Sequence, residues 1–159
     1  MPKTPETCDA ELGPKKAVLV GVREKSNRVV DKDDSIEELG RLAETMDYEP
    51  KAIMTQERDA PDSATYLGKG KVVELRDLVE REEADLVIID GVLSPVQARN
   101  LEDAVEVPVM DRTELILRIF ASRARTSEGK IQVELARAKH ALTRLAGFGV
   151  YMSNPGAGL

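Results

Sequence analysis

The feature that most constrains the fold is an alternation of short, strongly apolar segments with longer amphipathic segments. Strands that are apolar throughout are typical of parallel sheets that helices cover on both faces. Helices between such strands provide the crossovers that parallel neighbours require. We therefore predict an α/β domain with a small, four-stranded, mainly parallel sheet and flanking helices. The predicted strands are residues 17–22, 48–56, 85–90 and 107–111.

Helix-start signals lie between the predicted strands. Ser35 and Glu38 have the spacing of a capping box, and residues 94–97 combine an N-cap serine, a proline at the first helical position and a glutamine at the third. Asp111 is placed to cap the next helix. Pro50 restricts the second strand to the edge of the sheet or to its own first residues.

Composition and order along the chain suggest one ordinary domain with additions. The 159 residues have 42% hydrophobic and 3% aromatic content, so the core is expected to be aliphatic. A long helix is expected from about Ser127 to Ala146, after the sheet domain. The predicted divisions are a flexible arm (1–16), an α/β domain (17–124), a basic amphipathic helix (125–147) and a glycine-rich loop or tail (148–159).

Several protein classes do not fit this sequence. Its apolar runs are too short to cross a bilayer, and its first residues contain no apolar stretch typical of a secretory signal. The single cysteine, Cys8, cannot form an internal disulfide, and no Cys/His cluster suits a structural zinc. We expect a cytoplasmic protein without a membrane partner and without a bound metal.

The charge is distributed unevenly along the chain. The net charge is −6, yet residues 112–144 contain eight Lys or Arg and only three Glu, and residues 145–159 contain no charged side chain. A basic segment in an acidic protein favours a polyanionic partner, with aromatic side chains available to stack on bases. The alternative is a solvated helix face with local pairs such as Lys130–Glu134. The candidate RNA-binding residues are Arg123, Arg125, Lys130, Arg137, Lys139, Arg144, Phe148 and Tyr151.

The same helix has an apolar seam, defined by Ile131, Leu135, Ala138, Leu142 and Leu145. Its alternating spacing of four and three residues is that of a coiled coil, which needs a partner to bury it. The seam is expected either to pack on the α/β body or to pair with a second copy of the chain.

Two further groups of residues are candidate sites. Gly68, Lys69, Gly70 and Lys71 precede a predicted helix, but they lack the G-x-x-x-x-G-K-[ST] spacing of a phosphate loop. A turn from an edge strand into a helix is the favoured interpretation, and a weak anion site is the alternative. Ligand-facing loops are expected at the strand ends, near Arg23, residues 90–91 and residues 111–112.

Catalytic groups are scarce. His140 has no evident nucleophilic partner and is expected on solvated helix surface. Asp90 and Asp111 end predicted strands, where a turn and a helix cap account for them without a catalytic carboxylate pair. We expect this chain alone to have no enzymatic activity.

Residues 66–75, 93–102 and 109–147 together resemble the N-terminal region of the HflX-type ribosome-associated GTPases. The resemblance covers the chain from Ala17 onward. It implies an α/β subdomain, a helical hairpin and then a GTPase domain that uses GTP and magnesium. The N-terminal region of the family docks on the large ribosomal subunit, the hairpin loop points toward the peptidyl transferase centre, and the assembly helps to split stalled or idle ribosomes.

Carried over by residue, the resemblance places Arg123, Arg125, Lys130, Arg137, Lys139 and Arg144 on the basic first helix of the hairpin, with residues 147–159 at the start of its loop. The D-x-x-G and N-K-x-D motifs of a GTPase are not found. We therefore expect a module that binds ribosomal RNA, with a G domain or a second copy covering residues 127–146. The alternatives are a nucleotide-binding domain that uses Gly68–Lys71 and an oligomerisation element that uses residues 131–145.

Overall fold

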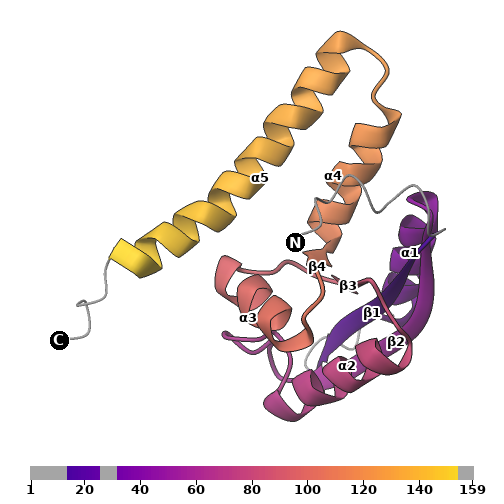
Figure 1. Ribbon diagram of the computed structural model, residues 1–159, viewed down its shortest axis with the longest axis vertical. Coiled ribbons are helices and arrows are strands. Elements are labelled where there is room, and N and C mark those ends of the chain that lie inside the picture. The colour runs from indigo at the N-terminus through magenta and orange to yellow at the C-terminus, as the bar shows by residue number, and fades with distance from the viewer. Residues whose placement is uncertain (1–13, 26–31, 154–159) are drawn as a thin grey trace, which may run out of the picture.

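The computed structural model describes the backbone of residues 14–25 and 32–153, and the side chains of residues 14–25 and 34–143. Strands and helices alternate along this part of the chain, as the apolar pattern predicts (Figure 1). The elements are β1 (Lys15–Glu24), α1 (Lys32–Thr45), β2 (Tyr48–Arg58), α2 (Lys69–Arg81), β3 (Leu86–Ile89), α3 (Pro95–Val105), β4 (Val109–Asp111), α4 (Arg112–Arg123) and α5 (Ser127–Ser153).

The four strands form one parallel sheet in the order β2-β1-β3-β4. This confirms the predicted fold class. Pro50 lies in β2, an edge strand, and the register between β1 and β2 shifts beside it, where Ala17 pairs with Pro50 and Val18 with Ala52. Strand β1 begins at Lys15, so the last residues of the predicted arm belong to the sheet.

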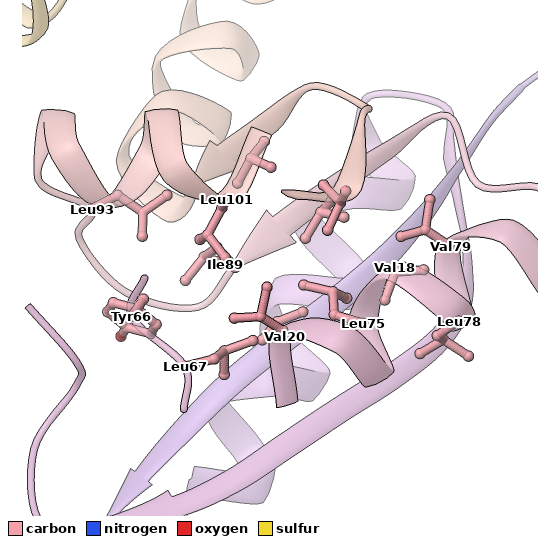
Figure 2. Close-up of a cluster of buried hydrophobic side chains, with 14 of the residues drawn as sticks. Val18, Val20, Tyr66, Leu67, Leu75, Leu78, Val79, Ile89, Leu93 and Leu101 are labelled. Carbon is pink, nitrogen blue, oxygen red and sulfur yellow. The ribbon is translucent and has the colours of Figure 1, made fainter. Parts of the chain in front are cut away.

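Helices cover both faces of the sheet. Successive side chains of a strand point to opposite faces, so β1 contributes to two separate apolar clusters. Val18 and Val20 pack with α2 and α3 on one face (Figure 2), whereas Ala17 and Leu19 pack with α1 and α4 on the other. Burial on both faces explains why the strand is apolar throughout.

Two of the predicted caps are present. Ser94 and Gln97 form a complete capping box at α3, in which Gln97 N donates to Ser94 Oγ over 3.1 Å and Ser94 N donates to Gln97 Oε1 over 2.8 Å. Asp111, which is fully buried, caps α4 by accepting from Glu114 N at 2.9 Å. Its second oxygen accepts from Leu93 N at 3.1 Å and so ties the start of α4 to the loop before α3.

The predicted capping box at Ser35 is wrong. Helix α1 begins at Lys32, so Ser35 lies inside the helix, and its hydroxyl donates to Asp90 Oδ2 over 2.7 Å. The side chain therefore joins α1 to the end of β3 instead of satisfying a backbone amide. Sequence spacing cannot distinguish these two uses of a serine, because the competing acceptor is 55 residues away in the chain.

Helix α5 is longer than expected. It continues through Gly147 and Gly149 to Ser153, so residues 148–153 extend the helix and do not begin a loop. A helical glycine costs about 1 kcal/mol relative to alanine, which lowers the stability of a helix without necessarily ending it. Helix α5 runs antiparallel to α4, contacts α4 and α3, and forms a hairpin with α4 (Figure 1).

Replacement of the buried cap tests the link between the sheet and α4. Asp111→Ala removes two acceptors for backbone amides and is expected to lower the free energy of unfolding by about 2–3 kcal/mol. Urea denaturation measures the change. The matched control is Asp77→Ala at an exposed position of α2, which is expected to change stability by less than about 0.5 kcal/mol. Equal effects of the two substitutions would contradict the assignment.

Candidate nucleic-acid interface

Helix α5 has two stripes of small or apolar residues, and only one of them faces the protein. Gly129, Val133, Ala136 and His140 are half-buried and recur every three or four residues along the side toward α4 and α3. Small side chains at three of these positions let the helices approach closely. This stripe, and not the predicted seam, is the docking face of α5.

The predicted seam lies on the solvent side. Ile131, Leu135 and Leu142 are 67%, 55% and 63% exposed, and Ala138 is exposed as well. The expectation that the seam packs on the α/β body is therefore wrong for these four residues. The side chain of Leu145 lies outside the described residues. An apolar row of this length on a surface helix marks a contact with another helix or molecule.

The basic side chains of the hairpin are also open to solvent. Arg137 forms an exposed ion pair with Glu134 at 3.4 Å, so Glu134 pairs with Arg137 and not with Lys130 as predicted. Such a pair is worth at most about 1 kcal/mol. Within the described residues, no carboxylate forms an ion pair with the other exposed cations, which are Arg123, Arg125, Lys130 and Lys139.

Two arginines of the basic segment have internal partners. Arg112 pairs with Asp90 at 3.2 Å and with Glu38 at 3.1 Å. Arg118 contacts Glu114 at 3.1 Å and the Tyr48 hydroxyl at 3.3 Å. Burial lowers the pKa of both guanidinium groups, but their hydrogen bonds outweigh burial and the net effect is to raise each pKa. These two charges hold the fold together, so the surface that is open to a polyanion begins at Arg123.

Three predicted contact residues cannot be placed. The side chains of Arg144, Phe148 and Tyr151 lie outside the described residues. Their backbone belongs to α5, which continues the direction of the hairpin helix past the last described basic side chain. The described part of the candidate interface consists of Arg123, Arg125, Lys130, Arg137 and Lys139.

The glycine-lysine segment begins a helix. Gly68 is the N-cap of α2, and Lys69, Gly70 and Lys71 form its first turn. Gly68 N donates to Gln56 Oε1 at 2.9 Å, and the Arg58 guanidinium lies close to Gly68, so neighbouring side chains already occupy the space beside this glycine. Lys71 pairs with Glu74 at 2.8 Å. These contacts favour the structural interpretation over an anion site.

The other candidate residues have structural surroundings. Asp90 accepts from Ser35 and Arg112, and Asp111 accepts from two backbone amides, so they do not form a catalytic pair. His140 is half-buried with a buried Nε2 atom, in a groove of about 360 Å³ between α4 and α5, which corrects the prediction of solvated surface. Nowhere among the described residues do three metal-ligating side chains cluster, and no described helix could span a membrane.

Comparison with known proteins identifies relatives for most of the chain. Residues 33–121 match the family described as GTP-binding GTPase N-terminal, and residues 123–159 match its GTP-binding GTPase Middle Region. The GTPase HflX of Alkalihalophilus pseudofirmus is 50% identical over 127 residues, which is 80% of this chain and 30% of that protein. The GTPase HflX of Escherichia coli is 47% identical over 116 residues, which is 72% of this chain and 27% of that protein.

Solved structures agree with this match. A GTP-binding protein from Sulfolobus solfataricus in complex with GDP superimposes with a TM-score of 0.63 at 26% identity, covering 86% of this chain and 40% of that chain. This chain thus spans about 30% of the length of the curated relatives that it matches.

The orientation of α5 is testable with two neighbouring substitutions. Val133→Asp places a carboxylate in the docking face and is expected to lower the free energy of unfolding by about 1–3 kcal/mol. Leu135→Asp on the exposed seam is expected to change it by less than about 0.5 kcal/mol. Chemical denaturation followed by circular dichroism distinguishes the two. A larger loss for Leu135→Asp would show that the seam, and not the Val133 stripe, is buried.

Proposed function

Because the chain belongs to the HflX family of GTPases and corresponds to its N-terminal region, we propose that it is a binding module for ribosomal RNA of the large ribosomal subunit. The observation that carries the proposal is the row of exposed cations on the α4–α5 hairpin, of which only Arg137 has a carboxylate partner among the described residues. Lys and Arg side chains that are free of internal partners bind phosphates and release condensed counterions.

The distribution of charge supports the same proposal. The α/β domain is acidic and would be repelled by a polyanion, whereas the hairpin is basic. This polarity orients the molecule, so that α5 approaches RNA and the sheet domain stays away from it. In RNA helices the bases are poorly accessible, and such a surface recognises chiefly the backbone and its shape.

The role in the longer protein follows from the family. We propose that the module positions a cytoplasmic GTPase on the large subunit, where the complete protein splits or rescues ribosomes with GTP. The chain itself contributes binding and not catalysis, because its sequence contains no G-x-x-x-x-G-K-[ST] phosphate loop.

The exposed seam favours a second role on the same helix. Each Leu or Ile that becomes buried contributes about 1.5–3 kcal/mol, so the row of Ile131, Leu135 and Leu142 is suited to bind another helix. We assign this role to a helix or G domain of the longer relatives or to a second copy of the chain. Arg137 lines the groove between α4 and α5 and not the row, so such a partner would leave it available to RNA.

Charge reversal tests RNA binding. The triple substitution Arg123→Glu, Arg125→Glu and Arg137→Glu is expected to abolish co-sedimentation with purified large subunits, because each change removes one attraction and adds one repulsion. The matched control reverses three exposed charges on the α/β domain, with Arg41→Glu, Lys69→Glu and Arg81→Glu. The control should retain most of the binding. Undiminished binding by the hairpin variant would refute the proposal.

A further inference from the structure

A crevice lies at the point where the topology of the sheet reverses. The chain passes from β1 to β2 on one side and then crosses to β3 on the other side of β1. In open parallel sheets the connections that follow two such neighbouring strands, here β1 and β3, lead to opposite sides and leave a ligand-binding crevice outside the carboxyl ends of the strands. A cavity of about 230 Å³ is found here, lined by the end of β1, by the first turns of α1, and by Thr55, Tyr66 and Asp90. We call it the Tyr66 crevice.

Tyr66 is held in the crevice in an unfavourable backbone conformation. Its side chain is 7% exposed, and its φ of 66° is rare for an aromatic residue and costs about 1–3 kcal/mol. Within the described residues, its hydroxyl has no hydrogen-bond partner. Figure 2 shows the ring at the end of the buried cluster, near Leu67 and Leu93. Tyr66 lines the crevice, so its hydroxyl can meet a ligand there.

The loop before Tyr66 is built to hold this conformation. Asp62 and Tyr66 exchange two backbone hydrogen bonds, of 2.9 and 3.0 Å. Asp62 Oδ1 also accepts from the amides of Ala64 at 2.8 Å and Thr65 at 3.0 Å, and these bonds lower the pKa of Asp62. Gln97, from the capping box of α3, donates to the Asp62 carbonyl at 2.6 Å. Hydrogen bonds within the loop and from α3 therefore hold the strained backbone of Tyr66 in place.

Gly91 makes room for the phenol. A Cβ on this residue would lie 2.1 Å from Tyr66 Oη, a separation that real atoms do not reach. The glycine that follows β3 is thus required by the position of the Tyr66 hydroxyl. A strained tyrosine, a glycine that admits it and a hydroxyl without a partner all converge on one cavity.

The polar wall of the crevice is close to electrically neutral. Asp90 accepts from Ser35 Oγ at 2.7 Å and from Arg112 Nη1 at 3.2 Å, so its charge has a nearby counterion. Arg23 and Glu24 contribute opposite charges at the end of β1. Burial raises the pKa of Tyr66, and the carboxylates of Asp90, Glu24 and Asp111 raise it further. The phenol therefore remains a hydrogen-bond donor at neutral pH. A wall without net charge offers no net attraction that would offset the desolvation of a ligand anion.

We propose that the Tyr66 crevice binds a small, uncharged, polyhydroxylated molecule the size of a single sugar ring. Hydroxyl groups both donate and accept, so they can bond to the carboxylates of Asp90 and Glu24 as donors and to the Tyr66 hydroxyl as acceptors. The volume is below the about 300–1,000 Å³ of pockets for drug-sized ligands, so a small molecule matches the crevice best. The site is separate from the cationic hairpin and is independent of RNA binding.

Ligand-observed saturation-transfer NMR with the full chain tests this assignment. The probes are D-ribose, D-glucose and myo-inositol as neutral polyols, ribose 5-phosphate as an anionic counterpart and adenosine as a larger nucleoside. At least one neutral polyol is expected to bind in the millimolar range, and ribose 5-phosphate is expected to bind more weakly than ribose. Binding of adenosine or ribose 5-phosphate without any neutral polyol would overturn the ligand class. The absence of saturation transfer to every probe would overturn the site.

Removal of one oxygen tests the role of the phenol. Tyr66→Phe keeps the ring in the cluster and is expected to weaken polyol binding about five- to tenfold, as the loss of one hydrogen bond predicts. Tyr48→Phe is the matched control, because the Tyr48 hydroxyl contacts Arg118 on a different face of the sheet. Circular dichroism confirms that both variants fold. Equal affinities in Tyr66→Phe and the wild type would refute the assignment, even if a polyol binds.

Discussion

Burial of strand β1 on both faces determines where the other elements lie. Its alternate side chains enter two apolar clusters, so α2 and α3 must cover one face of the sheet and α1 and α4 the other. Helix α4 then leaves the sheet from the buried cap at Asp111. Because α5 packs back on α4 and α3, the sheet sets the direction of the cationic helix. A defect in the packing of β1 would displace the cationic surface of the hairpin as well as the core.

The acidic domain and the basic hairpin are parts of one electrostatic arrangement. Arg112 and Arg118 lie at the base of the hairpin and form ion pairs within the fold. Arg112 pairs with Asp90 and Glu38, and Arg118 pairs with Glu114. Beyond them the cations face solvent. The division between structural and surface arginines thus falls along α4, and the net charge of −6 conceals a cationic face.

Sequence reasoning recovered the parts of the fold that depend on local pattern. The strands, the capping box at Ser94 and the cap at Asp111 follow from spacing along the chain and are confirmed. It failed where the deciding contact is distant. Ser35 bonds to Asp90 across the sheet, and α5 docks through its small residues and not through its more apolar seam. Hydrophobic spacing identifies a face that needs cover but does not identify which partner covers it.

The candidate sites also divide into features that follow from local sequence pattern and features that depend on distant contacts. Arg123, Arg125, Lys130, Arg137 and Lys139 are exposed, and their clustering could be recognised in the sequence because charge and helical periodicity are local properties. Their binding to RNA stays a prediction. The Tyr66 crevice was not predicted as a whole. Its strand-end residues, Arg23 and Asp90, follow from the topology of parallel sheets, but Tyr66 enters through a left-handed backbone conformation that no sequence motif signalled.

The most direct test of RNA recognition by the hairpin is the salt dependence of its dissociation constant for purified large ribosomal subunits. If several of the exposed cations contact phosphates, the logarithm of the association constant should fall steeply with the logarithm of salt concentration, by about 0.7–0.9 for each contact. A total slope of about −2 to −4 is expected. A slope near zero, with binding retained at high salt, would show that the cations do not meet phosphates and would contradict the account.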